Sequence, residues 1–225
     1  MAPAMAVITI LMVIMKTASQ IPANGWRIIA LALCIPALGL FHAALVSALL
    51  SLGFIDAADD ISFNNPNIAE AQGKKLRELA LENSTSAEDR LKLLHTSLSH
   101  WQEGIESRPL WPYYQLGALD IEVLLAKYSK PENRVSYQQK AQARISHIIE
   151  LAPNERGLDH SLLILSFIAW DWLEQENKSW LIERLKIVKR STLKEVFFYA
   201  KQANNQQDIC AHLSWNAVKK LCSAP

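Results

Sequence analysis

The longest uncharged stretch does most to limit how this chain can fold. No Asp, Glu, Lys or Arg occurs between Arg27 and Asp56, and the interval IIALALCIPALGLFHAALVSALLSLGFI is almost entirely apolar. About 20 apolar residues in a helix cross a hydrocarbon core of about 30 Å, because each residue advances about 1.5 Å. The run therefore predicts a transmembrane helix over residues 28–55, in which Pro36 is tolerated as a kink.

The charges that flank this run predict its orientation. Lys16 and Arg27 precede it, and three Asp residues follow closely. Lys and Arg beside a span remain cytoplasmic, so residues 1–27 are predicted to be cytoplasmic and residues 56–225 to form a periplasmic domain. The run exceeds the roughly 7–15 apolar residues of a cleaved signal. We therefore predict a single-pass inner-membrane protein that keeps its anchor.

Two alternatives remain open at the start of the chain. Residues 1–14 are apolar but too short to span a membrane alone. Met15 opens MKTASQIPANGWR, which has the charge pattern of a natural start. Either translation begins at Met15, or residues 1–15 form a short extra apolar helix. The domain lies outside the membrane in both cases.

The exported part has the pattern of an all-α domain. Alternating apolar and polar runs are missing, and helix formers dominate. Asn65 before Pro66 is typical of a helix start, as is Ser86 with Asp89 three positions later. Further helices are predicted over residues 112–128, 133–151 and 158–175, with two or three more over residues 178–222.

One unit of a tetratricopeptide pattern is legible within these helices. The pattern has an aromatic residue and a Leu-Gly pair on a first helix, small residues on a second, and a closing Pro. Its positions are filled here by Tyr113, Leu116, Gly117, Ala141, Ile145, Leu151 and Pro153. Gly117 and Ala141 are expected to let helix backbones approach closely. The join YSKPENRVSYQ is about twelve residues longer than in the standard unit, so we predict a degenerate tetratricopeptide-like antiparallel array.

Two of the three cysteines lie in the exported part, where disulfides persist. On one straight helix, Cys210 and Cys222 would lie about 18 Å apart, against about 6 Å for a disulfide. A bond therefore requires a break between them, which a helix cap at Ser214 would supply. The sequence leaves the bonded and the free state open.

Aromatic residues are densest in RPLWPYY, at residues 108–114. One interpretation is a packing seam, in which the prolines open a helix and the rings fill the space between helices. The other is a groove for a partner, in which Arg108, Trp111, Tyr113 and Tyr114 make the contacts.

Motifs for chemistry are missing from the sequence. There is no P-loop, no GxGxxG, no HExxH and no nucleophile motif. His95 and His100 are spaced i, i+5, which does not direct both rings at one metal. The chain has 23 Lys and Arg against 22 Asp and Glu, without a basic stripe for nucleic acid. We therefore predict no enzymatic activity, no cofactor and no metal, and no binding of nucleic acid.

The layout of the chain resembles a known family. Behind the apolar run, ESRPLWPYYQLGAL follows a helix ending in HWQEG, and ELAPNERG closes about forty residues later. Over residues 28–160 this resembles the VpsP-type accessory proteins of exopolysaccharide gene clusters. The resemblance implies a non-catalytic role in polysaccharide synthesis or export, with protein subunits of that machinery as partners. An enzyme acting on a glycan or lipid-linked sugar, and a purely structural membrane subunit, are the alternatives.

Overall fold

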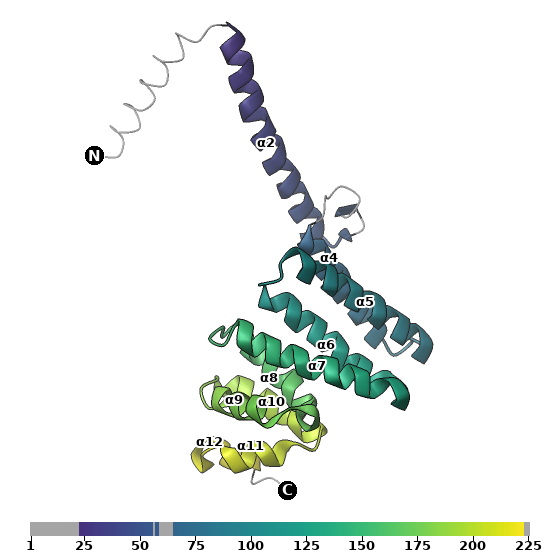
Figure 1. The fold of residues 1–225 in the computed structure, drawn as a ribbon, viewed down its shortest axis with the longest axis vertical. Helices are drawn as coiled ribbons and strands as arrows, with labels where there is room; N and C mark the ends of the chain where they lie inside the picture. Colours follow the sequence, from purple (N-terminus) through teal and green to yellow (C-terminus); the bar gives the residue numbers. More distant parts are fainter. Residues whose placement is uncertain (1–22, 56, 59–64, 223–225) are drawn as a thin grey trace, which may run out of the picture. The chain divides into compact units, whose positions relative to one another are not determined.

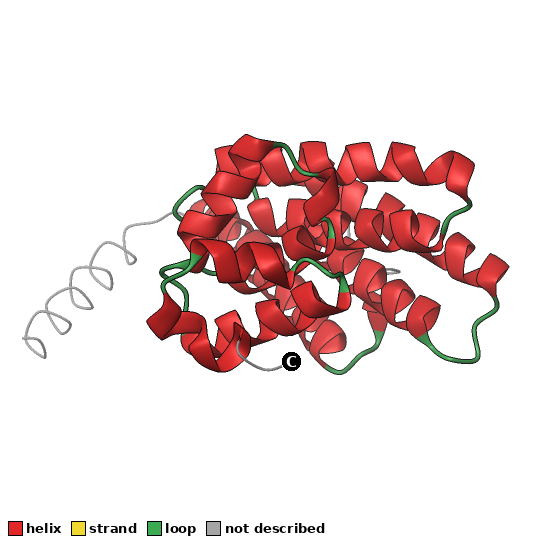
Figure 2. Ribbon diagram, turned by 90° about the horizontal axis from the view of Figure 1, so that it is seen from below, coloured by secondary structure: helices red, strands yellow, loops and turns green. Residues whose placement is uncertain are grey.

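The computed structural model describes residues 23–55, 57–58 and 65–222, and the predicted extra helix at residues 1–15 lies outside this part. The described residues form helices, turns and loops without a strand, which confirms the all-α prediction (Figure 2). The chain divides into two compact units, residues 1–63 and residues 64–225.

The first unit contains one long apolar helix, α2, over Ala23–Ser51. Its segment Cys34–Ser51 is long and apolar enough to cross a membrane. The helix ends before residue 55, the predicted end, because Gly53 adopts a φ of +80°. The Phe54 N–H then donates to the Leu49 carbonyl oxygen (2.9 Å), which closes the helix in a Schellman motif.

The second unit is a series of helices in which consecutive members are antiparallel and joined by short turns (Figure 1). Helices α4 to α7 lie side by side in chain order, and α8 packs on α6 and on α10. The helices are α4 (Pro66–Leu81), α5 (Ala87–Ser107), α6 (Pro112–Tyr128), α7 (Pro131–Leu151), α8 (Asp159–Ile168), α9 (Gln175–Leu185), α10 (Arg190–Gln202), α11 (Gln206–His212) and α12 (Trp215–Cys222).

The predicted helix starts are confirmed where a local cap fixes them. The Asn65 side chain accepts a hydrogen bond from the N–H of Asn67 (3.0 Å). Ser86 Oγ accepts from the N–H of Asp89 (3.1 Å) and donates to the carboxylate of the same residue. Such caps satisfy amide groups that a helix start leaves unpaired.

The structure differs from the prediction at the join between α6 and α7. Only Ser129 and Lys130 separate these helices, because Pro131 occupies the first turn of α7 and starts it before the predicted Asn133. The extra residues of the join therefore lengthen the helices and do not form a long loop.

The helix predicted over residues 158–175 is also shorter. It ends at Ile168, and a 3₁₀ turn follows over Trp170–Trp172. The side-chain amide of Asn205 donates to the Phe167 carbonyl oxygen (3.0 Å), and Trp170 stacks on the Phe167 ring with centroids 4.5 Å apart. These contacts stabilise the turn that ends α8 at Ile168.

Four helices, α9 to α12, cover most of residues 175–222, where two or three were predicted over residues 178–222. Asn204 adopts a φ of +62° and separates α10 from α11. Leu213 and Ser214 separate α11 from α12. Asn204 and the connection at Leu213–Ser214 thus divide residues 190–222 into separate helices. The apolar pattern of the sequence does not show these breaks.

Trp101 of α5 lies in a slot between two glycines. A Cβ atom on Gly117 of α6 would lie 2.5 Å from the six-membered ring of Trp101, and one on Gly73 of α4 would lie 2.8 Å from its Nε1. The close neighbour of Gly117 is therefore an indole ring, where the sequence predicted a helix backbone. Because Gly73 and Gly117 flank the ring on opposite sides, a shift of the ring away from α6 presses it against α4.

Gly117→Ala is therefore expected to destabilise the domain by about 2 kcal/mol, despite the better helix propensity of Ala. Gly104→Ala is the matched control, since its Cβ would meet the Tyr114 ring at 3.4 Å, an ordinary contact. Urea denaturation of both variants measures the difference. Equal stability of the two variants would show that the slot tolerates a methyl group.

Candidate functional site

A groove runs across the first helices of the successive antiparallel pairs, α4, α6, α8 and α10, with a cavity volume of about 850 Å³. We call it the first-helix groove. Apolar side chains from all four helices line it, among them Leu81, Leu116, Leu124, Ile164, Ile168 and Tyr199. A concave apolar surface of this kind with a few polar groups is typical of a binding site.

Charged side chains line the same groove beside α4. Arg77 of α4 forms an ion pair with Asp120 of α6, and a second guanidinium nitrogen lies 3.4 Å from the other carboxylate oxygen. Lys127 and Glu78 also line the groove, as do Lys74 and Glu70, which form an ion pair (2.6 Å). The groove therefore combines an apolar floor with charged groups of both signs.

Trp101 contributes to the groove from behind. It is the one lining residue that comes from α5, and it reaches the groove between α4 and α6. Its indole Nε1 is buried and has no hydrogen-bond partner among the residues that the structure describes. The Trp101 ring therefore packs between α4 and α6 and also forms part of the groove wall.

The predicted contact residues of RPLWPYY point in different directions. Tyr113 lines the first-helix groove and is half-buried. Trp111, 47% exposed, does not line it, and its ring lies 5.2 Å from that of Tyr113. Arg108 is exposed in the turn before α6.

Tyr114 belongs to the core. It is 1% exposed, its ring packs against Gly104, and its hydroxyl donates to the Asn67 side chain (3.3 Å). Burial raises the pKa of Tyr114, against the opposing charge of Arg108. Tyr114 therefore offers almost no surface to a partner, whereas Tyr113 and Trp111 do.

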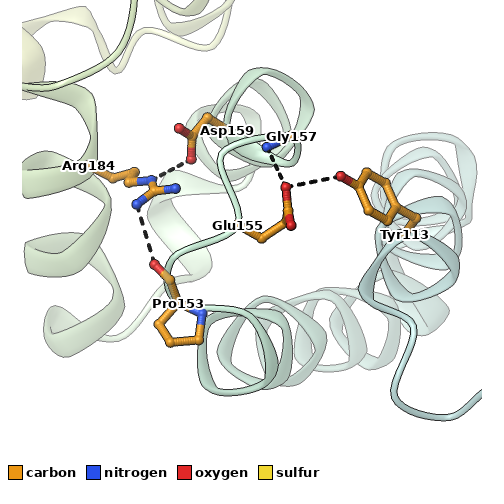
Figure 3. A network of polar contacts seen from close by, with 6 residues as sticks. All are labelled: Tyr113, Pro153, Glu155, Gly157, Asp159 and Arg184. Atoms are coloured by element: carbon orange, nitrogen blue, oxygen red, sulfur yellow. Dashed lines mark hydrogen bonds and ion pairs between the residues drawn. The ribbon is translucent and has the colours of Figure 1, made fainter. Parts of the chain in front are cut away.

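A polar network joins α6, α9 and the turn between α7 and α8 (Figure 3). Glu155 Oε1 accepts from the Tyr113 hydroxyl (3.2 Å) and from the Gly157 N–H (2.8 Å). Burial, followed by the hydrogen bond to Glu155, raises the pKa of Tyr113 above its ordinary value. Arg184 pairs with Asp159 and also donates to the Pro153 carbonyl oxygen (3.4 Å). Sequence reasoning missed this network because its members are far apart in the chain.

A second buried network joins α6 to α7. Arg144 Nε and Nη2 each donate to a carboxylate oxygen of Glu122, at 2.7 Å, and Nη1 donates to the side-chain oxygen of Gln115 (2.5 Å). Glu122 is 1% exposed. The available signal of a buried partner was the position of Glu122 within the otherwise apolar stretch IEVLLA.

The four residues predicted to pack helices occupy the seams of this domain. Leu116 is partly buried and packs on the larger apolar core, and Ala141 is fully buried in that core. Gly117 faces Trp101, and Pro153 follows α7 with its carbonyl held by Arg184.

A disulfide joins Cys210 of α11 to Cys222 of α12, with Cα atoms 6.0 Å apart. The chain turns at Leu213 and Ser214, between the two helices, as the bond requires. Both cysteines pack against the larger core. The bond thus holds the last helix against the domain.

Within the described ranges, no group of three or more His, Cys, Asp or Glu side chains is placed to hold a metal ion. His160 pairs with Glu195, and His95 lies 3.4 Å from the Tyr137 hydroxyl. Comparisons with family models, curated proteins and solved structures find no match.

Proposed function

We propose that this chain is a membrane-anchored accessory protein that binds a segment of a partner protein in the first-helix groove. The groove itself is the observation that carries the proposal. It is apolar along its floor, charged along one side, and formed by side chains on helices. Sites on helices are rigid enough to select a partner segment by shape.

The finer fold that we propose is a degenerate tetratricopeptide-like array. Helices α4/α5, α6/α7, α8/α9 and α10/α11 would be its pairs, and the first helix of each pair lines the groove. The signature residues Tyr113 and Gly117 stand on the groove side of α6. Stacked helix pairs form such concave binding surfaces in repeat proteins.

The occupant that fits this groove is an amphipathic peptide segment. Apolar anchors at helical spacing would enter between Leu116, Ile164 and Tyr199, as in helix-in-groove recognition. Charged residues of the segment, on either side of its apolar anchors, would then lie opposite charged groups of the groove. These groups are Lys74, Lys127 and the Arg77–Asp120 pair.

The setting that we propose is exopolysaccharide synthesis or export, with the domain in the periplasm. The resemblance of ESRPLWPYYQLGAL and ELAPNERG to the VpsP-type proteins supports the first part. Positive charges before the apolar run and the Cys210–Cys222 bond support the second, because disulfides persist in oxidising compartments. In this setting the groove would hold a protein subunit of the polysaccharide machinery.

Tyr199→Glu is expected to weaken partner binding at least about tenfold, because it places a charge against the apolar floor. Phe198→Glu is the matched control. It is the next residue on α10, is exposed, and does not line the groove. Both side chains are at least 36% exposed, so neither change threatens folding.

The measurement uses a photo-crosslinking amino acid at position 164, which lines the groove, in the full chain in its native host. The adduct yield is compared among the natural chain, Tyr199→Glu and Phe198→Glu. A discrete adduct that falls about tenfold with Tyr199→Glu and persists with Phe198→Glu is the expected result. Equal adducts from all three chains would contradict the groove as the binding site.

A further inference from the structure

Three turns and the first turn of α4 lie at the same end of the helical domain. The Tyr114 hydroxyl contacts Asn67 in the first turn of α4, and the Tyr113 hydroxyl contacts Glu155 in the turn between α7 and α8. Arg184, near the end of α9, contacts Pro153 in that same turn (Figure 3). These contacts place the α5–α6, α7–α8 and α9–α10 turns together, on a surface that we call the entry end.

The entry end exposes the largest apolar side chains of its turns. Leu110 is 79% exposed and Trp111 is 47% exposed in the α5–α6 turn. Ile187 is 60% exposed in the α9–α10 turn. Trp at the end of an apolar surface is the side chain that membrane interfaces favour most.

Basic residues outnumber acids at the entry end. Exposed basic residues in or beside the three turns are Arg108, Arg156, Lys186, Lys189 and Arg190. The exposed acids in or beside the same turns are Glu106, Glu155 and Glu183, and Glu183 pairs with Lys186. Exposed apolar side chains beside an excess of cations are typical of a surface that lies on anionic lipid.

The turns at the other end of the domain have the opposite charge. The α4–α5 turn contains Glu82, and the segment between α8 and α9 contains Asp171 and Glu174, all exposed. Lys130 is the one Lys or Arg in the α4–α5, α6–α7 and α8–α9 connections. The domain therefore has a cationic end and an acidic end.

The chain also enters the domain at the cationic end. Only residues 52–64 separate the end of the apolar helix at Ser51 from the α4 cap at Asn65. Because only thirteen residues join them, the entry end has a high effective concentration at any membrane that holds α2, and three of these residues, Asp56, Asp59 and Asp60, are acidic.

We propose that the entry end docks on an anionic bilayer surface, with Leu110, Trp111 and Ile187 in the interface and the neighbouring cations against lipid phosphates. This inference requires α2 to be in a membrane, and it is independent of the groove, because Leu110, Trp111 and Ile187 do not line it. Docking would fix which end of the domain faces away from the bilayer.

Hydrogen exchange of the full chain in lipid nanodiscs tests this proposal. With phosphatidylglycerol present, residues 108–112 and 186–190 are expected to exchange more slowly than in nanodiscs of phosphatidylcholine alone. The acidic-end segments 82–86 and 169–174 are the internal control and are expected to exchange equally in both. Equal exchange of the entry turns in the two lipids, or equal protection of both ends, would overturn the proposal.

Charge reversal gives a second, independent measurement. Each cation near an anionic surface contributes a factor of about five to the docking equilibrium. Lys189→Glu with Arg190→Glu is therefore expected to abolish the lipid-dependent protection, whereas Lys130→Glu at the other end leaves it unchanged. Protection that survives the double reversal would show that these cations do not hold the domain on lipid. Unchanged exchange elsewhere in the domain confirms that the variant is folded.

Discussion

Glu122→Ala is expected to destabilise the helical domain by about 3–5 kcal/mol, the usual cost of removing one partner from a buried ion pair. Glu122 is 1% exposed and accepts two hydrogen bonds from Arg144. Without it, the guanidinium remains between α6 and α7 with Gln115 as its one hydrogen-bond partner. The loss is measured as the free energy of unfolding in urea.

A partly exposed ion pair on the same helix provides the comparison. Asp120 pairs with Arg77 at the groove, where solvent reaches both side chains. Asp120→Ala is therefore expected to cost less than about 1 kcal/mol. If Glu122→Ala cost no more than Asp120→Ala, the buried network would not be what holds α6 against α7.

Reducing the Cys210–Cys222 disulfide is expected to lower stability by about 3 kcal/mol, the loss typical of a closed loop of about this length. The bond restricts the unfolded chain, and in the folded domain it holds α12 beside α11. The readout is the melting temperature of the full chain with and without reductant.

Serine variants separate this bond from other effects of reductant. A chain with Cys210→Ser and Cys222→Ser is expected to have the melting temperature of the reduced protein, and reductant is expected not to change it. Cys34→Ser, which changes the one free cysteine of the described residues, is expected to respond like the natural chain. An unchanged melting temperature of the natural chain in reductant would show that the Cys210–Cys222 bond does not stabilise the domain.

Local signals made the helix starts predictable. Caps at Asn65 and Ser86 and the proline at position 112 act on the turn that follows them, so a single sequence suffices to place α4, α5 and α6. The end of α8 was not predictable, because its carbonyl at Phe167 is held by Asn205, which is far along the chain.

The candidate site was predictable only in part. Adjacent residues on a helix point about 100° apart, so Tyr113 and Tyr114 cannot line one surface, and the structure places the first in the groove and the second in the core. The groove itself requires residues from α4 to α10. No local pattern brings Lys74, Leu116 and Tyr199 together, since that juxtaposition depends on how the helix pairs stack.

Complementation of a deletion strain tests whether the first-helix groove is needed for secretion of the polysaccharide. The natural host lacking this chain would receive the natural form, Tyr199→Glu or Phe198→Glu at equal membrane abundance, and secreted polysaccharide would be measured. The account predicts that polymer is lost on deletion, restored by the natural form and by Phe198→Glu, and not restored by Tyr199→Glu. Full restoration by Tyr199→Glu would contradict a partner-binding role of the groove, and unchanged polymer on deletion would contradict the proposed role in polysaccharide export.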